Sequence, residues 1–240
     1  MFEEYGLIPL LRDSRGKTSL EDLELQITLL GSPSFSASFL VLRRLFDLFS
    51  LRSVWLGGCP SPCATLPASV LLGAVPPGLD HPLIGPILSY HHNVRGGLAV
   101  FEEVTQAFFS YELARNCNRA VQDILIFEAW LFDSLLTKRA PSHFSEEKSL
   151  FFREVQGSHI VEHDLFARFD LDLPNPDEVE RAIHLCRLKW LNARIEEEGW
   201  FSPQSLIWEF AYHLFVIEWS FRNSDPEKID LSKIFQEIQA

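Results

Sequence analysis

Apolar residues at helical spacing mark the first element of the chain. Residues 17–31 read KTSLEDLELQITLLG, and their apolar positions recur every three or four residues, which is the spacing of one helix face. Ser19 and Asp22 stand at its start, three residues apart, so that each side chain can bond to the backbone amide of the other. The pattern predicts a capped helix that ends at Gly31. Its apolar face consists of Leu20, Leu23, Ile27 and Leu30.

Five further stretches have the apolar spacing of helices. Pro141 stops the third of them, and Asp177 and Glu178 open the fourth, since acidic residues favour the first turn of a helix. The last stretch is apolar nearly all round and is therefore predicted to be buried. These predicted helices cover residues 36–50, 96–116, 118–139, 177–198 and 202–222.

The zone between residues 57 and 97 has a different composition. It holds seven of the twelve Gly and seven of the fourteen Pro. Connections of this length are usually functional or contain short strands. The apolar runs 69–75 and 85–90 lie between breakers, a pattern typical of short buried strands or turns.

A β-hairpin is predicted near residues 150–162. The runs SLFFREV and SHIVEH favour strands and flank a Gln-Gly pair at 156–157, which is a turn signal. The expected fold is therefore mainly α (α+β), with one multi-helix domain over residues 1–240. Within it we expect N-terminal helices in 1–56, the irregular zone in 57–97, and a helical part with the hairpin in 98–240.

The charge of the chain changes which partners are expected. The net charge is −12, and residues 101–240 hold twenty-five acidic against fourteen basic side chains. Such a surface repels a phosphate backbone, so we expect no nucleic-acid partner. No run of eighteen uninterrupted apolar residues exists, so no membrane span is predicted. Four Cys do not make a disulfide framework, and a soluble, cytoplasmic protein is expected.

The segment HIVEH, with His159 and His163 at its ends, matches the H-x-x-E-H motif of a metalloprotease helix. That motif needs a helix, where positions four apart lie one above the other. On the second strand of the predicted hairpin the two His would stand about 13 Å apart, too far to share one metal. The geometry favours two His on an edge strand, and the metal site is the alternative.

Two pairs with the spacing Glu-x-x-x-His are further candidate metal ligands. On separate helices, Glu180 with His184 and Glu209 with His213 would supply the carboxylates and imidazoles of a di-metal site. The competing interpretation for the first pair is a solvated ion pair beside Arg187. The second pair lies on the helix predicted to be buried. There Glu209, and Glu218 further along, must be paired, protonated or bound to something.

The segment CPSPC (59–63), together with His91 and His92, contains the ligand types of a zinc site. The alternative is a pair of free cysteines and two loop histidines.

Part of the chain resembles the C-terminal half of HipA-like kinases. The stretches ILIFEAWLFDSLL, HIVEHDLFARF and PDEVERAIHLCRLKWL follow the order helix, hairpin end, helix. In the family the matching helix reads roughly VFDAWIxNxDR. Leu135 stands where the resemblance places the catalytic Asp, and Glu162 where it places the metal-binding Asp. The resemblance therefore implies a kinase-like scaffold without its chemistry.

Two shorter resemblances involve other families. HDLFARFDLDLPNP (163–176) is similar to the H-D-x-x-E-A…D-x-P-x-P segment of HD-domain phosphohydrolases, with Ala167 in place of the Glu. RDSRG (12–16) is similar to a segment of the partner subunit of methanobactin biosynthesis.

Two functional hypotheses follow from the sequence. The first is a non-catalytic binding or partner protein with a protein partner, because no catalytic motif is intact. Its expected surfaces are the aromatic-rich C-terminal helices and the Gly/Pro zone. The alternative is an enzyme that binds a divalent metal through the His and Glu residues of the C-terminal helices.

Overall fold

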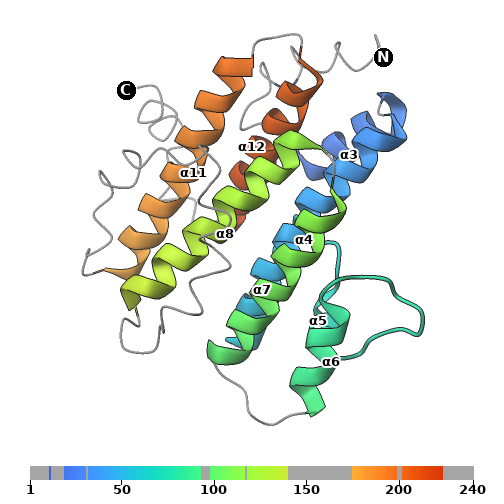
Figure 1. Ribbon diagram of the computed structural model, residues 1–240, viewed down its shortest axis with the longest axis vertical. Helices are drawn as coiled ribbons and strands as arrows, with labels where there is room; N and C mark the ends of the chain where they lie inside the picture. Colours follow the sequence, from blue (N-terminus) through green and yellow to red (C-terminus); the bar gives the residue numbers. More distant parts are fainter. Residues whose placement is uncertain are drawn as a thin grey trace. The chain divides into compact units, whose positions relative to one another are not determined.

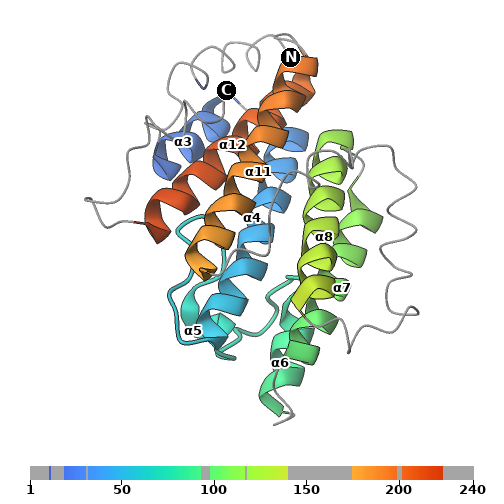
Figure 2. The same ribbon diagram turned by 90° about the vertical axis from the view of Figure 1, so that its left-hand side faces the viewer.

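The computed structural model describes residues 11, 19–30, 32–92, 98–116, 118–139, 175–198 and 202–223. In this part of the chain the regular elements are helices (Figures 1 and 2), which confirms a mainly α fold. They are α3 (Leu20–Leu30), α4 (Pro33–Trp55), α5 (Ala68–Leu71), α6 (Ile84–His92), α7 (Leu98–Arg115), α8 (Arg119–Arg139), α11 (Pro176–Glu198) and α12 (Pro203–Arg222). No described helix is long and apolar enough to cross a membrane.

The prediction of strands in the Gly/Pro zone is wrong for its described residues, 57–92. The run 69–75 forms α5 and a turn, and the run 85–90 lies within α6. Proline favours this outcome, because Pro67 has a backbone φ of −69° at the N-cap of α5. Pro86 stands in the first turn of α6, where a missing N–H breaks no helical bond. The predicted hairpin near 150–162 lies outside the described residues.

The predicted cap of α3 is confirmed. The Ser19 hydroxyl accepts a hydrogen bond from the Asp22 amide at 3.1 Å. The Ser19 amide donates in return to the Asp22 carboxylate at 3.3 Å. Because two of the unpaired amides at the helix start are satisfied, α3 begins at a fixed point.

Helix α4 ends in a Schellman motif. The Gly58 amide donates to the Ser53 carbonyl at 2.8 Å, and the Gly57 amide to the Val54 carbonyl at 3.0 Å. Gly57 has a φ of +82°, in the left-handed region that side chains with a Cβ avoid. This turn directs the chain out of α4 into the Gly/Pro zone.

Replacing Gly57 by Ala is expected to lower the free energy of unfolding by about 1 kcal/mol, because Ala is strained at this positive φ. Gly85 is the matched control, since a Cβ added there meets nothing within 4 Å and its φ is not positive. Gly85→Ala, inside α6, is expected to be neutral or stabilising by up to about 1 kcal/mol. Urea denaturation of the two variants measures the difference in their stabilities. Equal midpoints would contradict the requirement for glycine at position 57.

Residue contacts divide the chain into two compact units. Unit 1 comprises Met1–Arg43, Ser61–Cys63 and Glu162–Ala240, and unit 2 comprises Arg44–Pro60 and Ala64–Val161. Helix α4 contributes its first half to unit 1 and its second half to unit 2. Compactness alone does not decide whether the units fold separately, so the single domain stays a prediction.

The core of unit 1 is built around α12, which packs against α11 and α3. Residues 205–216 are all buried, so the predicted burial of this helix on every face is confirmed. The Phe210 ring lies 5.3 Å, centroid to centroid, from the rings of Phe35 and Phe39. Trp190 of α11 meets Trp208 edge to face at 5.3 Å. Aromatic contacts of this geometry add to the stabilisation from burial.

The core of unit 2 combines the second half of α4 with α7 and α8. Phe132 of α8 is half-buried at the edge of this core, with ring centroids 5.9–6.1 Å from those of three other phenylalanines. These are Phe49, Phe101 and Phe109. The three helices therefore form a scaffold from which the Gly/Pro zone extends.

Candidate functional site

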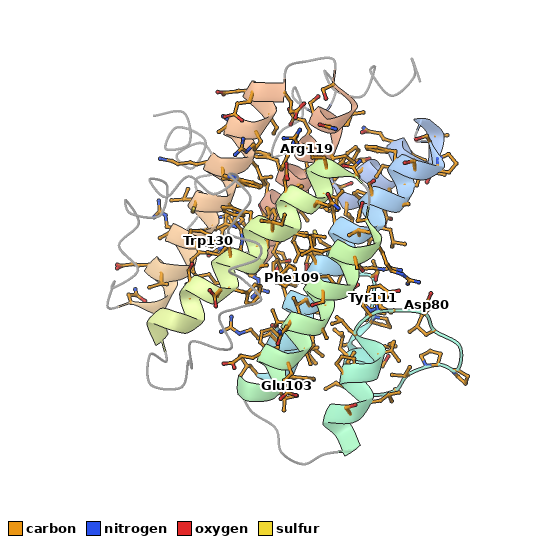
Figure 3. The ribbon with its side chains drawn as sticks, viewed as in Figure 1. Asp80, Glu103, Phe109, Tyr111, Arg119 and Trp130 are labelled. Atoms are coloured by element: carbon orange, nitrogen blue, oxygen red, sulfur yellow. The ribbon has the colours of Figure 1, made fainter. Side chains whose placement is uncertain are left out.

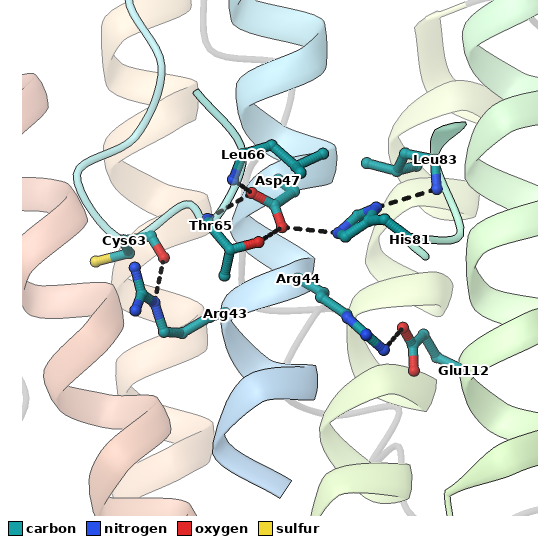
Figure 4. Close-up of polar contacts among 9 residues, drawn as sticks. All are labelled: Arg43, Arg44, Asp47, Cys63, Thr65, Leu66, His81, Leu83 and Glu112. Carbon is teal, nitrogen blue, oxygen red and sulfur yellow. Dashed lines mark hydrogen bonds and ion pairs between the residues drawn. The ribbon is translucent and has the colours of Figure 1, made fainter. Parts of the chain in front are cut away.

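A buried carboxylate on α4 holds the Gly/Pro zone within unit 2 (Figure 4). Asp47 is completely shielded from solvent. Its oxygens accept from the Thr65 amide at 2.6 Å, the Thr65 hydroxyl at 2.5 Å and the Leu66 amide at 2.8 Å. The Nε2 atom of His81 lies 2.9 Å from the same carboxylate. We call this arrangement the Asp47 hub; it satisfies a buried charge with four donors.

The geometry of His81 fixes its protonation. Its Nδ1 accepts the Leu83 amide at 3.2 Å, and an amide can only donate. The neutral ring therefore carries its proton on Nε2 and donates it to Asp47. Both ring nitrogens are used inside the protein, and the side chain is buried. The His–Asp pair is accordingly a structural clamp and has no free nitrogen to act as a general base.

A second polar contact in unit 2 joins α4 to α7. The Arg44 guanidinium donates to the Glu112 carboxylate at 3.3 Å (Figure 4). Burial raises the pKa of Glu112, and the positive charge of Arg44 opposes that rise. The positive charge of Arg44 thus compensates the buried carboxylate of Glu112.

The tripeptide Ser61–Cys63 belongs to unit 1 and binds α12. The Ser61 hydroxyl donates to the buried Glu218, and the Cys63 amide donates to the Ser61 oxygen at 3.0 Å. The Cys63 thiol lies 3.4 Å from the Leu214 carbonyl. Arg43 donates to the Cys63 carbonyl at 3.0 Å (Figure 4). Ser61–Cys63 is therefore anchored within unit 1 through Arg43 of α4 and Glu218 of α12.

The two cysteines of CPSPC have opposite environments. Cys59 is exposed, whereas Cys63 is buried. Burial, with a smaller contribution from the Glu218 charge, raises the pKa of Cys63 to about 12. Without a bound metal, Cys63 is therefore a protonated thiol at neutral pH, and the zinc site stays a prediction.

Thiol labelling with a disulfide reagent at pH 8 is expected to separate these two cysteines. With a pKa of about 12, the Cys63 thiolate amounts to roughly one molecule in ten thousand, and burial blocks access as well. Cys59→Ser should remove a fast-reacting thiol from the native protein, and Cys63→Ser should leave it in place. Rapid native labelling that disappears in Cys63→Ser would show that the tripeptide is not packed as described.

The predicted burial of Glu209, His213 and Glu218 is confirmed. His213 Nε2 lies 2.9 Å from the Leu11 carbonyl oxygen, which can only accept, so this nitrogen carries a proton. Glu218 accepts from Ser61 and from Arg222, the latter at 2.5 Å. His213 Nε2 and Glu218 thus serve hydrogen bonds within unit 1.

The solvated ion pair predicted for Glu180 and His184 is wrong in part. Glu180 is exposed, but the cation near it is Arg222, at 3.9 Å. His184 is buried and stacks on Trp219, with ring centroids 4.5 Å apart and an angle of 11°. Burial lowers the pKa of His184 well below its usual value, and the charges of Arg187 and Arg222 act in the same direction. His184 is therefore neutral and lies within the α11–α12 contact.

The metal site remains a prediction. Among the described residues, no three His, Cys, Asp or Glu side chains gather as metal ligands would. His159 and His163 lie outside the described part of the chain. Counting metal per chain in untagged protein and in a His213→Ala variant tests the remaining candidates.

Exposed large apolar side chains concentrate in one segment of the chain, and those of this segment belong to unit 2. The described residues contain eight of them, and four lie between positions 56 and 88. The exposed fractions of Leu56 and Leu72 are 78% and 55%. The four are Leu56, Leu72, Leu79 and Leu88. We refer to residues 56–88 as the neutral leucine segment.

The Asp47 hub was not predicted from the sequence, although one signal for it exists. Asp47 stands between the apolar Phe46 and Leu48 in the predicted helix 36–50, which carries apolar residues on most of its faces. An ionisable residue in such a position needs a buried partner. Its partners lie 18 to 34 positions further along the chain, so their identity follows only from the fold.

Comparison with known proteins found no matching family model, no matching curated protein and no matching solved structure.

Proposed function

We propose that this chain is a non-catalytic binding protein that docks a partner protein through the neutral leucine segment. The exposed leucines of this segment are the observation that carries the proposal. A single exposed leucine is ordinary on a protein surface, so the proposal rests on four of them within one segment of the chain.

Charge supports the same surface. Between Arg52 and Arg95 the sequence has a single charged residue other than histidine, Asp80, which Figure 3 shows on the loop between α5 and α6. The centres of protein interfaces are depleted of charge in this way. The chain as a whole carries −12. The partner we propose therefore presents an apolar centre surrounded by basic residues, which the acidic remainder of the chain attracts.

The Asp47 hub holds the segment ready for binding. Thr65 and Leu66 are bonded to Asp47 upstream of α5, and His81 is bonded to it upstream of α6. The residues between these anchors include the exposed Leu72 and Leu79. A loop fixed at both ends loses less conformational entropy when a partner binds.

The other predicted surface, the aromatic-rich C-terminal helices, does not fit the structure. The aromatic side chains of α12 are buried, with the exception of Phe221. They form the core of unit 1. The HipA-like scaffold stays a prediction, because its hairpin and Glu162 lie outside the described residues.

The proposal is tested by affinity capture with the full-length chain in its source cells. Leu72→Ser/Leu79→Ser is compared with wild type and with Phe221→Ser, which changes an exposed apolar residue elsewhere. We expect one protein held by wild type and Phe221→Ser and reduced at least tenfold in the double variant. Direct binding of that purified protein should show the same loss.

Two results would overturn the proposal. One is that every captured protein is held equally by the double variant. The other is that the double variant loses only a second copy of the chain, since the charge argument requires a different, basic partner.

A further inference from the structure

A second apolar surface lies on α3, in unit 1. Leu23 and Ile27 face inward and are buried. Leu25 and Leu29, four positions apart, face outward with 59% and 68% of their surface exposed. Residues at this spacing lie about 6 Å apart on the same side of a helix. The helix therefore buries one apolar row and leaves a second one open.

Acidic residues flank the open row. Glu21 and Asp22 are exposed in the first turn of α3, and the helix contains no Lys or Arg. At about 100° per residue, Glu21 lies on one side of Leu25 and Asp22 on the other side, beside Leu29. Glu24 is bonded to Arg43 of α4. The exposed face is thus a leucine pair within negative charge, which we call the α3 face.

The α3 face is rigidly presented. The reciprocal bonds between Ser19 and Asp22 fix its first turn. Arg43 bonds to Glu24 and so holds α3 against α4. The buried Leu23 and Ile27 attach the opposite side of the helix to unit 1. A preformed helix of this kind needs no ordering before it binds.

We infer that the α3 face is a docking surface for a basic amphipathic helix. The i, i+4 leucine row is the ridge that packs into the groove of another helix. Lysine or arginine beside the apolar stripe of the partner would pair with Glu21 and Asp22. A second copy of α3 is a poor occupant, because symmetric pairing would bring acidic residues together. This surface belongs to unit 1 and is independent of the neutral leucine segment.

A synthetic helical peptide with one leucine face and one lysine face tests the inference. Its affinity for the full-length chain is measured by fluorescence anisotropy, alongside a peptide with glutamate in place of lysine. We expect saturable binding of the lysine peptide only. Leu25→Ser/Leu29→Ser should weaken it at least tenfold, whereas Leu72→Ser should leave it unchanged. Glu21→Gln should reduce the dependence of affinity on salt.

Several outcomes would overturn the inference. They are the absence of binding, equal binding of the glutamate peptide, and lysine-peptide binding that survives Leu25→Ser/Leu29→Ser. The last result would mean that the peptide is attracted only by the net charge of the chain. Loss of binding in Leu72→Ser alone would assign the peptide to the neutral leucine segment instead.

Discussion

Replacing Asp47 by Asn is expected to lower the free energy of unfolding by about 3–5 kcal/mol, the range for breaking a buried charged network. The carboxylate accepts from four donors. Asn offers one oxygen, and its NH₂ group would face a donor from Thr65 or His81. His81 cannot compensate by moving its proton, since Nδ1 already accepts the Leu83 amide.

Asp133→Asn is the matched control, because Asp133 is also a buried aspartate of unit 2. Burial raises the pKa of Asp133, so the folded chain holds this proton more tightly than the unfolded chain. Its charge therefore destabilises the fold at neutral pH, and this effect disappears as the pH falls below the usual Asp value. Asp133→Asn should raise the melting temperature at pH 7 and change little at about pH 3.

Hydrogen exchange locates the effect of Asp47→Asn. The amides of Thr65, Leu66 and Leu83 should lose protection first, because they bond to the hub. An Asp47→Asn variant with the stability of wild type and unchanged exchange in these amides would contradict the hub as the anchor of the segment.

Phe210→Ala is expected to lower the free energy of unfolding by about 3–5 kcal/mol, the usual range for a buried Phe. The ring is completely buried and touches two aromatic rings of α4. Because α12 is surrounded by packed side chains, the cavity left behind cannot collapse without moving a helix. Guanidinium denaturation followed by tryptophan fluorescence measures the loss.

Phe221→Ala supplies the control on the same helix. Phe221 is 43% exposed, so its removal should change stability by no more than about 0.5 kcal/mol. Equal losses in the two variants would mean that Phe210 does not lie at the centre of the core of unit 1.

The sequence predicts the helices of this fold well. The cap between Ser19 and Asp22 and the all-round burial of residues 205–216 both follow from local patterns. Such patterns depend on neighbours three or four positions apart, which any packing preserves. The strands predicted for the short runs 69–75 and 85–90 were wrong, because periodicity does not distinguish a short helix from a short strand.

In the candidate sites, too, the features set by local patterns were predictable and those set by tertiary packing were not. Burial of Glu209 and His213 was predictable from their apolar helix, but the contact of His213 with the Leu11 carbonyl was not. The solvated ion pair predicted for His184 rested only on the spacing of residues within its own helix. Trp219 of α12 covers it, and that contact depends on how two helices pack. Polar partners far apart in sequence are set by tertiary packing, which the local pattern does not encode.

Photo-cross-linking from position 72 tests the central claim most directly. A benzophenone amino acid replaces Leu72 in the full-length chain, and the same substitution at Phe221 serves as the reference. If the neutral leucine segment docks a partner, position 72 should form an adduct with a distinct protein in the source cells. Position 221 should form no such adduct, and the adduct from position 72 should weaken when Asp47→Asn is added. The absence of any adduct from position 72, or equal adducts from both positions, would contradict the proposed binding surface.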